Sequence, residues 1–400
     1  MIRFTTAGES HGKALVAILE GMPAGLPLRA EDVDQDLRRR MMGHGRGARM
    51  KIEADRAEIL SGVRAGETLG SPIALLIENR DWAHWSDVMA PEPDGEGAPP
   101  RRRRLVRPRP GHADLVGLIK YQRADARDIL ERASARETAA RVACGAVCRV
   151  LLARVGVEIG SHVVRLGEVE AAPRGALPVP LNPAADASPV RCLDADAAQR
   201  MIAAIDAAKR DGDTLGGIVE VVARGMPVGL GSHVSWDRKL DGRLAGALMS
   251  IPAVKGVEIG LGFGTAARRG SAVHDAIVRR SSPSTGGFGR ESNRAGGLEG
   301  GITTGEPLVL RAAMKPISTL MRPLDTVDLV TGGPSKAQAE RSDVTAVPAL
   351  GVIAEAMTAL VVADALVEKF GGDAVPELEA NLRHYLEVIN ARWDPPATGA

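Results

Sequence analysis

The chain has 400 residues, a formal net charge of +1 and an apolar fraction of 44%, values typical of a globular protein. The balanced charge gives no support to non-specific nucleic-acid binding, and no apolar run nears the 18 residues of a membrane span. The sequence has no secretory signal and its three cysteines form no C-x-x-C pair, so we expect a cytoplasmic protein without disulfides.

Alternation and helical periodicity predict five strands and five helices. In chain order they are the strand Ala14–Leu19, the helix Glu31–Met42, the strand Pro72–Ile77, the helix Ser134–Arg154, the strand Val157–Val164, the helix Ala195–Arg210, the strands Gly217–Ala223 and Leu308–Met314, and the helices Val347–Phe370 and Glu377–Asn390. The Ser134 and Val347 helices are apolar or small almost all round, which is typical of helices covered on several sides. Ser134 and Glu137 form a capping-box pattern at the start of the first of these two.

Two segments differ from the rest in composition. Ala90–Arg104 is rich in proline, glycine and then arginine, and Ala171–Val190 is rich in proline with few large apolar residues. We expect both to be surface insertions that bury no core. Residues 394–400 are expected to form a flexible tail.

Parts of the chain are echoed downstream in the same order. Val16–Leu26 resembles Val219–Leu230, Leu60–Leu75 resembles Leu298–Leu310, and the Ser134 helix has a counterpart in the Val347 helix. Chance matching of Gly-Met-Pro turns is the alternative. Duplication predicts an α+β fold in which residues 1–393 form one domain of pseudo-duplicated halves, with two central helices flanked by sheets.

Three polar segments carry residue types suited to proton transfer and anion binding. Gly8–Gly12 presents His11 between glycines; it also fits G-x-S-x-G, but the strand after it disfavours a hydrolase elbow with Ser10 as nucleophile. Arg107–Asp114 is stiffened by two prolines and presents His112 on a loop. Arg132–Glu137 places arginines at a helix N-terminus, where the dipole favours an anion.

Two further segments allow more than one interpretation. Arg40–Gly47 is either an anion clamp on a flexible loop or a solvated helix end. Arg341 and Asp343 share one face of an extended backbone, with a surface ion pair as the alternative. Arginine outnumbers lysine 42 to 9, which fits either phosphate and carboxylate recognition or genomic base composition. The polar segments together indicate one site for a multiply anionic substrate, and because the histidines lack metal-ligand spacing we predict no metal site.

The order of these segments resembles that of a known family. G-E-S-H-G, R-P-G-H-A-D, R-x-S-A-R-E-T-A, S-N-x-A-G-G-x-x-G-G-I, K-P-I-S-T and R-x-D-x-x-A-V-P-A follow one another from residue 8 to residue 349. The set is similar to that of chorismate synthase, which catalyses the last step of the shikimate pathway. The resemblance implies a β-α-β sandwich, usually homotetrameric. It also implies a lyase that converts 5-enolpyruvylshikimate 3-phosphate to chorismate and phosphate by 1,4-anti elimination on reduced FMN.

The same resemblance implies roles for single residues. His11 would protonate the departing phosphate, His112 would stabilise the charge of the reduced flavin, and Asp343 would relay a proton from flavin N5. The substrate-binding residues would be Ser10, Arg46, Arg109, Arg136 and Arg341. FMN contacts would fall on Arg132, Ala133, Ser134, Pro252, Ala253, Gly300, Lys315, Pro316, Ile317, Ser318, Thr319 and Arg341. Arg40 and Arg46 would lie near a site for NADP.

Some features depart from the resemblance or leave alternatives. Ala133 stands where a serine is common, and Arg294 stands where a histidine is common and has no assigned role. A flavin-phosphate binding protein without catalysis would not need His11, His112 and Asp343 together. A nucleic-acid binder would depend on Arg101–Arg109. We expect a small-molecule substrate and no nucleic-acid or membrane partner; the sequence leaves open whether NADPH or an external flavin reductase reduces the flavin.

Overall fold

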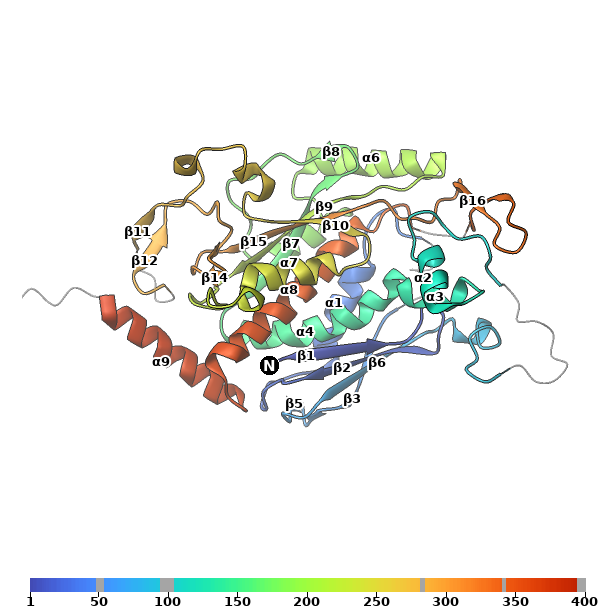
Figure 1. Cartoon of the computed structure of the whole chain (residues 1–400). Coiled ribbons are helices and arrows are strands. Elements are labelled where there is room, and N and C mark those ends of the chain that lie inside the picture. The colour runs from blue at the N-terminus through green and yellow to red at the C-terminus, as the bar shows by residue number, and fades with distance from the viewer. Residues whose placement is uncertain (48–53, 94–103, 281–284, 340–342, 394–400) are drawn as a thin grey trace, which may run out of the picture.

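Two antiparallel sheets enclose a layer of helices in the computed structural model, which describes residues 1–47, 54–93, 104–280, 285–339 and 343–393. Figure 1 shows the first sheet at the bottom, the second at the top, and the helices α4 and α8 crossing between them. The first sheet has the order β1-β2-β6-β3, formed by Arg3–Ala7, Ala14–Glu20, Ile73–Glu78 and Ala57–Ser61. The second has the order β10-β15-β9-β7-β8, formed by Val254–Ile259, Leu308–Met314, Gly217–Arg224, Glu158–Leu166 and Val169–Glu170.

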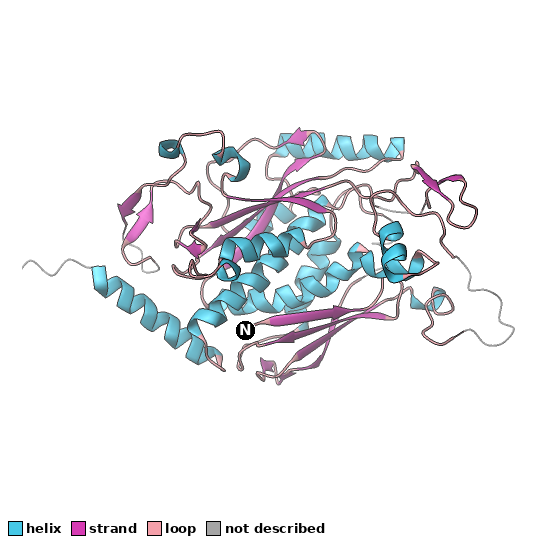
Figure 2. Ribbon diagram, viewed as in Figure 1, coloured by secondary structure: helices cyan, strands magenta, loops and turns pink. Residues whose placement is uncertain are grey.

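The side chains of the first sheet alternate between the helical layer and the outside, as period-two strands require. In β2, Leu15, Ala17 and Leu19 are buried, and they lie opposite Ile77, Leu75 and Ile73 of β6. Burial of these pairs against the helices fixes the register, because a one-residue slip would expose the whole apolar set. Figure 2 shows the resulting layers, with helices in cyan between strands in magenta.

The helices between the sheets are α1 (Ala30–Met41), α4 (Thr138–Arg154), α7 (Leu240–Met249) and α8 (Val347–Phe370). Helices α4 and α8 make the most extensive contact of any two elements in the described part of the chain. A Cβ added to Gly145 of α4 would lie 2.6 Å from the Cα of Ala356 in α8, so only glycine permits this approach. By length and composition α8 could cross a membrane, yet 89% of its apolar window is buried inside the protein.

The two sheets repeat one another. The order β1-β2-β6-β3 corresponds to β7-β9-β15-β10, and the echoed segments predicted from the sequence lie at matching places. Thr68 of β5 (Glu67–Thr68) donates to the carbonyl of Pro23 at 2.6 Å and accepts from the Leu26 N–H at 2.9 Å. Thr303 of β14 (Ile302–Thr303) donates to Pro227 at 2.7 Å and accepts from Leu230 at 2.8 Å. Such matched hydrogen bonds are not expected of chance turn matches, and the predicted fold class is confirmed.

The remaining elements lie around this sandwich. They are β4 (Val63–Arg64), α2 (Asp114–Tyr121), α3 (Arg127–Ala133), α5 (Leu181–Asp186), α6 (Ala195–Asp211), β11 (Ile277–Arg279), β12 (Phe288–Arg290), β13 (Leu298–Glu299), β16 (Asp325–Val327), β17 (Pro334–Lys336), α9 (Val375–Trp393), and 3-10 turns at Trp82–His84, Ala135–Glu137, Trp236–Arg238, Gly262–Thr265 and Gly270–Ala272. In Figure 1, α2, α3 and β16 lie at one end of the molecule and α9 at the other.

Two of the sequence predictions need correction. The segment 171–190 is not wholly at the surface, because Leu181 and Ala185 of α5, together with Val190, are buried. The capping box is also absent: Ser134 caps a 3-10 turn by accepting from the Arg136 N–H, while the Glu137 carboxylate binds Thr6 and Arg141. Most of 90–104 and the whole of 394–400 lie outside the described residues.

Candidate active site

His11 lies on the loop between β1 and β2, and a buried carboxylate holds it. The Nδ1 of His11 is 2.9 and 3.0 Å from the two carboxylate oxygens of Glu131, and the same carboxylate accepts the His11 backbone N–H at 2.9 Å. The His11 side chain is 13% exposed and that of Glu131 only 2%. Burial opposes ionisation of Glu131, but the hydrogen bonds and charge of His11, with the charge of Arg127, keep its pKa below the ordinary value.

An aromatic ring braces the other side of this histidine. The rings of His11 and Trp85 are stacked with centroids 3.8 Å apart. The indole Nε1 of Trp85 donates to Asp81 at 2.9 Å, and the Arg127 guanidinium lies 5.1 Å from the Trp85 ring centre. The His11 imidazole is therefore held by Glu131 at its Nδ1 edge and by Trp85 on one ring face.

His112 is held in the same manner on the loop before α2. Its Nδ1 lies 2.5 Å from Asp114, whose side chain is 2% exposed. Arg109 also binds Asp114, through Nε at 2.9 Å and Nη2 at 3.1 Å. Burial alone would raise the pKa of Asp114, but the hydrogen bonds from His112 and Arg109 outweigh it and hold the pKa well below its usual range.

Lys315 and Ser318 lie against the turn that carries His112. The Lys315 Nζ and the Ser318 Oγ both donate to the carbonyl of Gly111. Gly111 has φ +77°, and a Cβ there would lie 3.2 Å from the Lys315 Nζ. Thr319 accepts from Arg109 Nη1 at 2.8 Å, and the Lys315 N–H donates to Ala253 at 2.9 Å. These contacts gather hydroxyl and ammonium donors around one loop.

Arg136 and Arg40 share a buried aspartate. The Arg136 Nη1 pairs with Asp55, and the Arg40 Nη1 lies 3.5 Å from the same carboxylate. Arg40 also donates to Thr138 at 3.0 Å and to the Ala135 carbonyl at 2.9 Å. These two contacts fix Arg40 to the start of α4, and the residue is only 4% exposed. Its role in binding NADP stays a prediction.

Asp343 and Arg46 meet across the loop that follows α1. Arg46 Nη1 lies 2.8 Å from the Asp343 carboxylate, which also accepts the Gly47 N–H at 2.6 Å. Asp343 thus has an ion-pair partner, but the pair is not a surface pair within its own segment, because the partner is Arg46, another predicted site residue, whose side chain is only 9% exposed. Arg341 lies outside the described residues.

Two series of contacts link these groups, one around His11 and one around His112 and Asp343. Ser134 Oγ donates to Ser10 Oγ at 3.2 Å, which ties the His11 loop to the turn that carries Arg136. Val344 donates to Gly45 at 2.8 Å and accepts from Leu215 at 2.9 Å, while the adjacent Thr214 hydroxyl binds the Ile317 carbonyl at 2.8 Å. The Asp343, Lys315–Thr319 and Arg109–His112 segments are thereby neighbours.

Other predicted residues have different surroundings. Arg132 is 43% exposed and donates to the carbonyls of Gly8 and Thr6 at 3.1 and 2.8 Å, beside the His11 loop. Gly300 lies between β13 and β14, whereas Lys315 follows β15, so the part of Gly300 in an FMN site stays a prediction.

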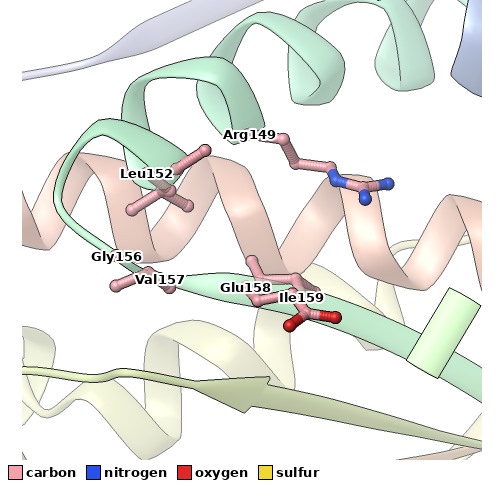
Figure 3. A pocket seen from close by; sticks show the side chains of 7 residues that line it. Arg149, Leu152, Gly156, Val157, Glu158 and Ile159 are labelled. Atoms are coloured by element: carbon pink, nitrogen blue, oxygen red, sulfur yellow. The ribbon is translucent and has the colours of Figure 1, made fainter. Parts of the chain in front are cut away.

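Two hollows lie elsewhere. One of about 270 Å³ lies between the end of α4 and β7, lined by Arg149, Leu152 and Glu158 among others (Figure 3). A second of about 430 Å³ lies between α1, α4 and α5. Neither is lined by a predicted site residue, so charge and hydrogen bonding identify the candidate site rather than concavity. Within the described ranges, no cluster of three His, Cys, Asp or Glu side chains is arranged to hold a metal.

Sequence reasoning missed several supporting residues. Asp55, Trp85 and Glu131 were not singled out, and Asp114 was treated only as part of a loop. Asp114 follows His112 by two residues, which is a usable signal. Glu131 precedes Arg132 but is 120 residues from His11, so spacing alone does not connect them.

Comparison with known proteins identifies the family of the chain. The family model of chorismate synthase matches residues 2–367. The chain belongs to the chorismate synthase family. It is 59% identical over 392 residues to chorismate synthase of Moorella thermoacetica, covering 97% of this chain and 100% of the relative. It is 58% identical over 398 residues to chorismate synthase of Thermobifida fusca, covering 98% and 100%.

A solved structure supports the same assignment. A crystal structure of chorismate synthase is 45% identical, covers 98% of both chains and superposes with a TM-score of 0.78. The chain is therefore a lyase of the last step of the shikimate pathway and acts on a small molecule.

Proposed function

We propose that this chain converts 5-enolpyruvylshikimate 3-phosphate to chorismate and inorganic phosphate by 1,4-anti elimination, with reduced FMN bound. The observation that most supports this is the pairing of two histidines from distant segments with buried carboxylates, Glu131 and Asp114. Each histidine belongs to a series of contacts that includes Arg109, Arg136 or Arg46. That combination matches proton transfer next to a multiply anionic substrate.

The proposed elimination breaks two bonds on one ring. The C–O bond to phosphate breaks with its electron pair on the departing oxygen, and a C–H bond breaks with loss of a proton. The electrons of the C–H bond shift through the ring to complete a second double bond, so the reaction has no net redox change. An acid is required for the phosphate and a base for the proton; His11 is the proposed acid, and Asp343 is the proposed base that would receive the proton by way of the flavin.

Arginines hold the substrate in this proposal. The side chains of Arg46, Arg109 and Arg136 are 9%, 8% and 5% exposed, and each is oriented by a carboxylate. A planar guanidinium can grip carboxylate or phosphate through two parallel hydrogen bonds. In a closed site each such contact is stronger than in water, which favours a substrate with several negative charges.

The residues around Gly111 fit the phosphate of FMN. Lys315, Ser318 and Thr319 supply an ammonium and two hydroxyls, and a Cβ at Gly111 would crowd the Lys315 ammonium at 3.2 Å. Ser134 and Arg132 would complete the contacts on the side of His11. When bound, reduced FMN would supply an electron-rich partner for the eliminating ring. His112 would donate from Nδ1 to Asp114 and, when protonated, would hold a second proton at Nε2.

An anaerobic assay tests this proposal. The full-length protein is mixed with substrate and chemically reduced FMN, and chorismate and phosphate are followed together. We expect equal amounts of both products and none with oxidised FMN. Absence of product from well-folded protein with reduced FMN would overturn the assignment.

Two further parts of the proposal have separate tests. We propose a cytoplasmic homotetramer, and light scattering at several concentrations would test its oligomeric state. Whether NADPH reduces the bound flavin is decided by stopped-flow bleaching of FMN under NADPH without other proteins. Bleaching would indicate self-sufficiency, and its absence would indicate an external flavin reductase.

A further inference from the structure

Glu131 makes a set of contacts that a merely structural carboxylate would not need. It accepts two hydrogen bonds from one residue, from the His11 N–H and the His11 Nδ1, and a third from Arg127 Nη1 at 2.7 Å. The Glu131 carbonyl also accepts the Ser10 N–H at 2.9 Å. Helix α3 thus fixes both the backbone and the ring of the His11 loop.

These contacts select one arrangement of the imidazole. A neutral imidazole carries its proton on one nitrogen, and a hydrogen bond to an acceptor determines which. When protonated, His11 carries a proton on each nitrogen, and because Nδ1 donates to Glu131, the proton that leaves during catalysis is the one on Nε2. A carboxylate beside the ring also stabilises the positive charge that the ring bears when protonated.

Trp85 and Arg127 keep this arrangement rigid. The stacked indole limits rotation of the His11 ring about its long axis, and Asp81 fixes the indole in turn. Arg127 sits four residues before Glu131 on the same helix and holds one carboxylate oxygen. The Glu131 side chain is 2% exposed, so water does not compete for these contacts.

We propose that Glu131 is the positioning residue for the His11 acid, fixing its tautomer through Nδ1 so that Nε2 delivers the proton, with Trp85 as the brace. This rests on the proposed function, in which His11 protonates the departing phosphate. Glu131 does not touch substrate in this role and acts only through His11.

A double-mutant cycle tests the proposal in the full chain. Glu131→Gln removes the charge at constant size, and we expect kcat to fall at least tenfold with KM changed less than threefold. In a His11→Ala background the same substitution should lower kcat by no more than twofold, because the group it positions is gone. An equal loss in both backgrounds, or full activity of Glu131→Gln, would overturn the proposal.

The chain offers a matched control. Glu220 of β9 also binds a histidine and an arginine, His162 at 3.3 Å and Arg311 at 2.9 Å, but lies in the second sheet among no predicted site residues. Glu220→Gln should leave kcat within twofold of the parent. A tenfold loss of kcat in Glu220→Gln would show that breaking a Glu-His pair outside the site also lowers activity. That result would count against a specific role for Glu131.

A spectroscopic readout is independent of flavin and of turnover. In ¹⁵N-histidine-labelled protein, the signal missing from His11→Ala identifies His11. We expect its Nδ1 to carry the proton in the parent and in Trp85→Phe, and the tautomer ratio to change in Glu131→Gln. An unchanged ratio would refute the proposal. Product formation by the parent separates this result from the proposed function, since an inactive parent would instead remove that function.

Discussion

Both histidines of the candidate site have Nδ1 against a carboxylate that is almost inaccessible to solvent. The partner of His112 is two residues away, so a close reading of the motif can supply it. The partner of His11 is brought in by packing of α3 beneath the β1–β2 loop. Sequence patterns therefore predicted the histidines but not the groups that orient them, because only the folded chain makes Glu131 and Trp85 neighbours of His11.

Removal of either imidazole should slow the reaction without preventing binding. We expect His11→Ala and His112→Ala each to lower turnover at least tenfold, because general acid–base help is worth roughly 10²–10⁴ in rate. Asp114→Asn should lower kcat and also raise KM, since Asp114 orients Arg109 as well as His112. The measurements are steady-state rates with reduced FMN and titrations of FMN and substrate. Unchanged turnover in both alanine variants would remove the acid–base assignment.

At the scale of elements, the predicted ends of long segments with a clear hydrophobic periodicity lie within a few residues of the observed ends. Strands β2, β7, β9 and β15 and helices α1, α6 and α8 belong to this group. Short or glycine-containing elements were missed. Strand β1 has five residues and lies at a sheet edge, and α7 contains Gly242 and Gly246, which weaken a helical pattern. Tertiary packing stabilises these elements rather than local propensity.

The crossing of α4 and α8 depends on a missing side chain. Gly145→Ala should destabilise the protein by about 1–3 kcal/mol, because the added methyl meets the Ala356 backbone. Gly246 of α7 is the matched control, since a Cβ added there would have no neighbour within 4 Å. Gly246→Ala should stabilise by up to about 1 kcal/mol through helix propensity. Urea unfolding measures both, and equal effects of the same sign would contradict this view of the crossing.

A buried charge cluster joins α8 to its neighbours. Glu355, fully buried in the middle of α8, accepts from Arg39 of α1 at 2.8 Å, Arg149 of α4 at 2.9 Å and Arg191 at 3.0 Å. Burial by itself would raise the pKa of Glu355, but the charges of these three arginines outweigh it and hold the pKa at about 2. Its ionised form therefore stabilises the fold above the unfolded-state pKa near 4.5, and that contribution is lost as pH falls from there to about 2.

Substitution of Glu355 should reveal this dependence. Glu355→Gln leaves buried arginines without their counter-charge, so we expect a loss of roughly 3–5 kcal/mol at pH 7. The difference from the parent should narrow as pH falls through the window from about 4.5 to about 2. Glu368→Gln, on the same helix but 35% exposed and bound to Arg238 and Arg243, should cost less than about 1 kcal/mol. Circular dichroism of urea unfolding across pH is the measurement; a pH-independent difference would contradict it.

At the scale of the whole molecule, the repeat was visible in the sequence because the turns that close the strands carry distinctive Gly-Met-Pro residues. The hydrogen bonds of Thr68 and Thr303 show how closely the two copies agree. What the sequence did not contain is the relative position of the copies, which α4 and α8 determine by packing on each other.

The repeat predicts equal consequences of equal substitutions. Thr68→Val and Thr303→Val each remove one hydroxyl that donates to a proline carbonyl and accepts a leucine N–H, at sites 3% and 1% exposed. We expect each to cost about 1–3 kcal/mol, because two backbone groups lose a partner. Chemical denaturation of both variants tests this, and a large effect in only one half would show that the halves have diverged in stability.

The packing of α4 against α8 also has a consequence for folding during synthesis on the ribosome. Helix α8 begins about 190 residues after α4 ends. At about 5–20 residues per second, the ribosome needs roughly 10–40 s to produce the intervening chain. During that interval the apolar face of α4 that packs on α8 in the folded protein stays exposed. The nascent chain is therefore prone to aggregation and to binding by chaperones until α8 leaves the ribosome.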